Sequence, residues 1–125
     1  MLLDFAAFET KSEPTTALPY RRLSPGERLL REVRDIAGPL AELVDHRETA
    51  WASITFSGAR HTIVLRFTGT EAASDGERLI AHLPDHEFRL RGTLVADASV
   101  VRVDHELAPA PLMEVECEIL LLDED

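Results

Sequence analysis

The sequence predicts an α+β domain in which two helices pack on one face of an antiparallel sheet of about five to six strands. Two segments repeat apolar residues at three- and four-residue steps, as one face of a helix does, and each begins with a Ser-x-Gly-Glu pattern. Several segments alternate apolar and polar residues, which is typical of strands with one buried face. The 125 residues are 45% hydrophobic and 29% charged, the balance of a folded domain.

We expect residues 24–125 to form this single α+β domain and residues 1–23 to form an N-terminal segment with a proline-containing loop. The apolar run Leu2–Phe8 is too short for its periodicity to distinguish a strand from a helix. If it is a strand, the element order is that of a ferredoxin-like sheet with a C-terminal hairpin extension. If it is helical, a helix-wrapped or cystatin-like curved sheet is the alternative.

The first helix is expected to begin at Ser24. Ser24 is a preferred N-cap residue, Pro25 suits the first helical position, and Glu27 completes a capping box. Apolar residues then recur at helical steps from position 29 to position 44. Because Gly38-Pro39 interrupts this series, we expect a kink there or two short helices in phase.

A β-hairpin is expected next, because residues 51–67 alternate on both sides of Gly58-Ala59. Glycine in the first of two turn positions suits a type II′ turn. Such a turn pairs Ile54 with Ile63 and Trp51 with Arg66, and it places an apolar face, Ile54 included, beneath the helices. The opposite face then carries a candidate interface for a second subunit or a ligand, formed by Trp51, Thr55, Val64 and Arg66.

The second helix is expected to begin at Ser74, because Ser74 to Glu77 repeats the Ser-x-Gly-Glu pattern of the first helix, and to stop near Pro84. The repeat is explained either by an internal duplication or by two independent capping boxes. We favour independent capping boxes, since residues 11–18, which would match a strand at 61–68, contain Pro14 and do not alternate.

Two or three further strands complete the expected sheet. Residues 88–94 and 113–121 alternate, and a short strand at 100–103 lies between them. If the first and last of these strands are neighbours, their charges form an exposed ladder that pairs Arg89 and Arg91 with Glu114, Glu116 and Glu118. Cys117 falls on the apolar face of its strand, where a thiol is usually inert.

Composition excludes several classes of function. The net charge of −10, from 23 acidic and 13 basic residues without a basic patch, argues against nucleic acid as a partner. No apolar run approaches the roughly 18 residues of a membrane span, so no membrane is expected. A single cysteine favours a reducing cytoplasm. The scattered glycines form no phosphate-binding or dinucleotide pattern, so no cofactor is expected. Arginine supplies twelve of the thirteen basic residues and Asn and Gln are absent, as is typical of GC-rich bacterial genomes.

Three of the five histidines follow an aspartate, at Asp45-His46, Asp85-His86 and Asp104-His105. Histidine beside a carboxylate is a common unit of acid–base and metal sites. Adjacent residues on a strand point to opposite faces, however, and no spacing matches a metal-binding motif, so no metal is expected. A candidate polar cluster forms if the relevant side chains converge in a pocket: His61, His86, His105, Asp85 and Asp104.

Two functional hypotheses follow. The first is a small, non-enzymatic cytoplasmic module for interaction or self-association, which forms a homo-oligomer or binds a protein partner. It rests on the lack of a catalytic motif and on an outward-facing Trp51 and Val64. The alternative is a small-molecule-binding enzyme that uses the His/Asp cluster in a pocket between helices and sheet.

Overall fold

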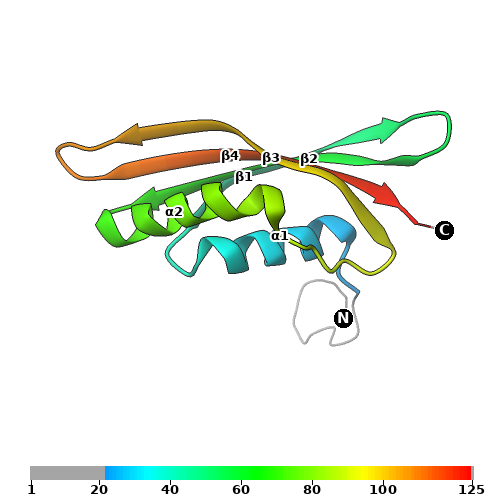
Figure 1. The fold of residues 1–125 in the computed structure, drawn as a ribbon, viewed down its shortest axis with the longest axis horizontal. Coiled ribbons are helices and arrows are strands. Elements are labelled where there is room, and N and C mark those ends of the chain that lie inside the picture. The colour runs from blue at the N-terminus through cyan, green and yellow to red at the C-terminus, as the bar shows by residue number, and fades with distance from the viewer. Residues whose placement is uncertain (1–21, 125) are drawn as a thin grey trace, which may run out of the picture.

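The computed structural model describes residues 22–124 as two helices on one face of a four-stranded antiparallel sheet (Figure 1). The expected α+β class is confirmed, with four strands in place of five to six. The segment Leu2–Phe8 lies outside the described residues, and the ferredoxin-like arrangement is not confirmed. The elements, in chain order, are α1 (Pro25–Ala37), β1 (Glu42–Ala52), β2 (Ser57–Thr68), α2 (Thr70–His82), the short 3-10 helix η1 (Leu83–Asp85), β3 (Thr93–Glu106) and β4 (Leu112–Asp123).

The element order is a helix followed by two strands, repeated once. The strand order in the sheet is β1-β2-β4-β3, so the second strand of each half lies at the centre. The β1–β2 and β3–β4 hairpins project past the helices at opposite ends of the molecule (Figure 1). The two halves therefore approximate a two-fold arrangement, which is the order that an internal duplication produces. The expectation of two independent capping boxes is wrong, because the N-cap of α2 is Gly69 and not Ser74.

Helix α1 begins as expected. Ser24 accepts a hydrogen bond from the backbone N–H of Glu27, and the Glu27 carboxylate accepts one from the Ser24 backbone, which completes the capping box. The expected continuation to position 44 is wrong. The helix ends at Ala37, because Gly38 adopts a left-handed φ of 89° and Pro39 follows it. Of the remaining apolar residues of the series, Leu40 lies in the turn after the helix, and Leu43 and Val44 belong to β1.

The β1–β2 hairpin turns at residues 53–56 and not at Gly58-Ala59. Ser53 donates its backbone N–H to the Phe56 carbonyl at 2.7 Å, and Trp51 lies opposite Gly58 where Arg66 was expected. The displacement, from 66 to 58, is an even number of residues, so both registers keep the same alternation and the pattern could not separate them. Gly58 has a packing role, because a Cβ there would lie 1.9 Å from the Leu121 carbonyl oxygen of β4.

Helix α2 begins at Thr70, so Ser74 lies inside the helix and is not its N-cap. The N-cap is Gly69, whose φ is 97°. Gly76 faces the sheet, where a Cβ would lie 2.7 Å from the Met113 sulfur and 3.0 Å from a Phe67 ring carbon. The glycine of the repeated pattern therefore permits close packing of helix on sheet. The helix ends at His82 and η1 contains Pro84, as expected.

The strands expected at 88–94 and 100–103 are replaced by a loop and one long strand, β3, which begins at Thr93. This difference accounts for the lower strand number. Bulges interrupt β3 between Val95 and Asp97 and between Val100 and Arg102, which breaks the alternation that would have revealed one continuous strand. A third bulge lies in β1, between positions 43 and 45. Strand β4 contains the expected segment 113–121.

The core lies between the helices and the facing side of the sheet. Both central strands contribute alternate residues to it, and both helices contribute one stripe each; fully buried members include Leu29, Val33, Ile63, Leu65, Phe67, Leu79, Val115, Cys117 and Ile119. Cys117 is on the apolar face, as expected. Burial, with a smaller contribution from Glu116, raises the pKa of the Cys117 thiol to about 12, which keeps it protonated and unreactive at neutral pH.

Candidate functional site

The face of the sheet opposite the helices is uncovered over the described residues (Figure 1). Its composition changes along the strands. At the end where the β1–β2 hairpin projects, the row across the sheet is Trp51, Gly58, Leu122 and Leu94, which is uncharged. The rows beyond it carry progressively more arginine and glutamate. The uncovered face therefore has an apolar end and a charged end.

Ion pairs cross the charged end of this face. Glu114 of β4 lies between two arginines, 3.1 Å from Arg66 of β2 and 3.2 Å from Arg102 of β3. Arg102 also contacts Glu116 at 3.0 Å, and Arg60 contacts Glu118 at 3.8 Å. The three glutamates thus pair across strands as expected. The prediction that Arg89 and Arg91 are their partners is wrong, because both arginines lie in the loop before β3.

The four residues of the expected interface do not lie together, because β1 and β2 pair in a different register from the predicted one. Trp51 is half-buried on the uncovered face and Thr55 is exposed in the hairpin turn. Val64 lies in the centre of the sheet with 5% of its surface exposed, and Arg66 is engaged by Glu42 and Glu114. The expected Trp51–Arg66 pair does not form, because Trp51 is opposite Gly58. Trp51, Val64 and Arg66 all belong to the uncovered face, but only Trp51 and Thr55 lie at the hairpin end.

The hairpin end also exposes two large apolar residues, of which Ile54 was expected on the buried face. Ile54 is fully exposed and Phe56 is half-exposed, because the turn lies beyond the helices. We call Trp51, Ile54, Thr55 and Phe56 the hairpin tip. A signal for it was present in the sequence: the eleven residues from 49 to 59 contain no ionisable side chain, in a chain with a net charge of −10.

His61 is buried, with 1% of its surface exposed, and its partner is a histidine that was not included in the expected cluster. His46 Nε2 and His61 Nδ1 share a hydrogen bond of 3.0 Å, with the rings tilted by 40°. Glu48 is opposite His61 in the sheet. Burial lowers the pKa of His61; Glu48 opposes this effect and His46 adds to it. In this hydrogen bond one ring nitrogen donates its proton and the other accepts it through a lone pair.

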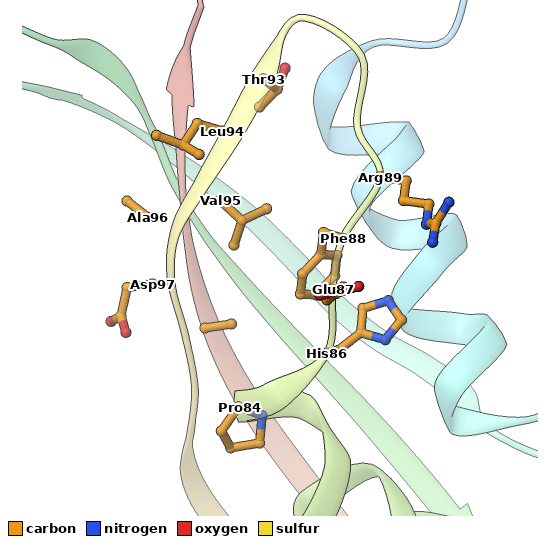
Figure 2. A pocket seen from close by; sticks show the side chains of 11 residues that line it. Pro84, His86, Glu87, Phe88, Arg89, Thr93, Leu94, Val95, Ala96 and Asp97 are labelled. Carbon is orange, nitrogen blue, oxygen red and sulfur yellow. The ribbon is translucent and has the colours of Figure 1, made fainter.

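His86 is held by a different element. Its Nε2 lies 3.1 Å from a Glu32 carboxylate oxygen of α1, and the other oxygen accepts the backbone N–H of Arg89 at 3.0 Å. Glu32 therefore fixes the loop after η1 against α1. A groove of about 610 Å³ lies between this loop and β3 (Figure 2). In Figure 2, His86 and Arg89 lie on the α1 side of the loop, and Phe88 faces Val95.

The other members of the expected polar cluster lie elsewhere. Asp85 ends η1, and Asp104 contacts Arg102 on the uncovered face. His105, the next residue, points to the opposite face at the far end of β3, beside a small cavity that also involves Leu107 and Pro111. His61, His86 and His105 thus have separate surroundings. Residues 22–124 contain no group of three or more His, Cys, Asp or Glu side chains arranged to hold a metal ion.

Comparisons with known proteins add little to this description. No protein-family model matches the chain, and no curated protein matches it. Among solved structures, it is similar to a chain of the virion of a native gene transfer agent particle, with a TM-score of 0.49 and 16% identity over 78% of this chain and 85% of that one. None of the helices in the described residues is long and apolar enough to span a membrane.

Proposed function

We propose that this chain is a non-enzymatic interaction module that self-associates through the hairpin tip. The observation that carries the proposal is the exposure of Ile54 and Phe56 on a projecting turn that contains no charge. The exposure of clustered apolar side chains to water is unfavourable, and such clusters on a protein surface mark contact sites. The buried, unreactive Cys117 is compatible with a reducing cytoplasm as the place of action.

The alternative, an enzyme with a His/Asp cluster, has less support. Acid–base catalysis requires its groups within hydrogen-bond reach of one substrate. His61 contacts His46, His86 contacts Glu32, and His105 lies at the far end of β3. These separate surroundings favour structural roles for the histidines, so the interaction hypothesis is preferred.

Sedimentation velocity over a concentration series tests the proposal. We expect the wild-type chain to associate as its concentration rises to roughly 500 µM, a range that detects weak contacts. The change Ile54→Ser removes the exposed apolar side chain, and we expect it to weaken association at least about tenfold. Val101→Ser is the matched control, because Val101 is also an exposed β-branched residue but lies in the middle of β3. A wild-type chain that stays monomeric over the whole series would disprove the proposed function.

A further inference from the structure

The end of the molecule opposite the hairpin tip carries a cavity of about 330 Å³. It lies between α2 and the β3–β4 hairpin. Ala73, Leu107 and Pro111 form its apolar wall, and the polar side chains at its border are Thr70, Ser74, Glu77 and His105. Leu107 is 73% exposed, so residues 22–124 leave this cavity open. The β1–β2 and β3–β4 hairpins lie at opposite ends of the molecule (Figure 1), so the exposed Ile54 and Phe56 are at one end and this cavity is at the other.

We propose that the chain assembles head to tail, with the hairpin tip of one copy seated in the cavity beside Leu107 of the next copy. The inference rests on the proposed function and adds to it the surface that receives the tip. Ile54 and Phe56 supply the inserted apolar side chains, and Leu107 and Pro111 supply the apolar wall. Each copy has one of each surface, so the contact is heterologous and every added copy leaves a free end until a ring closes.

Charge favours contact at the ends over contact between sheet faces. The uncovered face carries four arginines (Arg47, Arg60, Arg66 and Arg102) and eight acidic residues (Glu42, Asp45, Asp97, Asp104, Glu106, Glu114, Glu116 and Glu118). Two such faces would bring excess negative charge together, which is unfavourable. The tip carries no ionisable residue from 49 to 59 and meets no such repulsion from a second acidic chain.

Two blocking variants test the arrangement. Ile54→Glu blocks the tip but leaves the cavity free, and Leu107→Glu blocks the cavity but leaves the tip free. We expect each variant alone to sediment as a monomer, and an equimolar mixture to form a dimer and nothing larger, because each copy then has one usable surface. Val101→Glu, which adds the same charge in the middle of β3, should assemble as the wild type does.

The outcomes separate the two proposals. If Leu107→Glu assembles as the wild type does while Ile54→Glu does not, the tip contacts another surface, so head-to-tail assembly is wrong and the proposed function stands. A mixture of the two variants that remains monomeric also overturns head-to-tail assembly. A monomeric wild-type chain overturns both proposals. Circular dichroism and thermal melting verify that each variant is folded.

Cross-linking gives a second measurement that does not depend on introduced charge. A chain with both Ile54→Cys and Leu107→Cys should form a ladder of covalent multimers with a short bis-maleimide. Each single cysteine variant should not, because in a head-to-tail assembly a tip does not meet another tip and a cavity does not meet another cavity. The native Cys117 is fully buried and does not interfere. A ladder from the Ile54→Cys single variant would indicate tip-to-tip contact and contradict the arrangement.

Discussion

At the scale of single residues, His61 shows how a polar side chain becomes part of a core. Its ring is buried beneath the first turn of α1, where a Cβ on Gly26 would lie 2.9 Å from His61 Cε1. His46 satisfies one ring nitrogen at 3.0 Å. A buried polar group is tolerated when it is hydrogen-bonded, but a proton on each ring would place two positive charges side by side. The contact between α1 and the sheet therefore requires a neutral histidine.

This requirement predicts that stability falls in mild acid. Burial lowers the pKa of His61 in the folded chain below its ordinary value of 6.5, so the unfolded chain takes up the proton more readily. The stabilising contribution is complete above about pH 6.5 and decreases as the pH falls below it. Urea unfolding at about pH 7.5 and about pH 5.5 should give a lower midpoint at the lower pH. The difference should shrink in His61→Leu and persist in His82→Leu, where the histidine is exposed. An unchanged difference in His61→Leu would assign the effect to other groups.

At the scale of elements, the same Ser-x-Gly-Glu pattern occupies two different positions. In α1 the serine is the N-cap and closes a capping box, whereas in α2 the serine lies in the interior of the helix and is exposed. Local sequence alone could not distinguish these cases, because Gly69 provides an earlier start for α2 and the close approach of Gly76 to β2 and β4 is a tertiary contact.

The different positions of Ser24 and Ser74 predict different effects of a serine-to-alanine substitution on the free energy of unfolding. Ser24→Ala should lower the free energy of unfolding by about 1 kcal/mol, the usual loss for an N-cap serine. Ser74→Ala should leave it unchanged or raise it slightly, because alanine is the stronger helix former at an exposed interior position. Chemical denaturation of both variants measures the contrast. Equal losses in the two variants would mean that Ser74 also caps a helix.

The sequence predicted the elements with strong local signals and missed those decided by distant partners. The α1 start, the stop near Pro84 and the buried face of β4 follow from capping, proline geometry and alternation. The hairpin turn was misplaced because registers that differ by an even number of residues share one pattern. Bulges concealed the length of β3. The His46–His61 contact joins residues on two strands, so it depended on the register that was predicted incorrectly.

At the scale of the whole molecule, the two halves share one core. Strands β2 and β4 pair over eleven positions at the centre of the sheet, and each helix contributes to the same buried cluster. Helix α2 packs on strands of both halves, because Gly76 faces Phe67 of β2 and Met113 of β4. A helix-strand-strand unit on its own would expose most of the surface that the complete chain buries.

We therefore expect residues 1–68 and residues 69–125 to be unfolded when expressed separately, and to restore the native fold when mixed. The cut lies between β2 and α2, outside regular structure. Two-dimensional NMR spectra of each fragment should lack dispersion, and the mixture should regain the spectrum of the intact chain. A well-dispersed spectrum from either fragment alone would show that a half has an independent core.

The three bulges lie in the edge strands β1 and β3 and affect whether strands of other molecules can pair with them. Strands β1 and β3 are the edges of the sheet, so the backbone N–H and C=O groups on their outer sides have no partner strand. Such open edges can pair with strands of other molecules and form fibrils. The bulges twist these edges out of register, and charged residues such as Asp45 and Arg102 accompany them. Sideways addition of strands is thereby discouraged, so a concentrated preparation of this chain should resist the formation of fibrils built by edge-strand pairing.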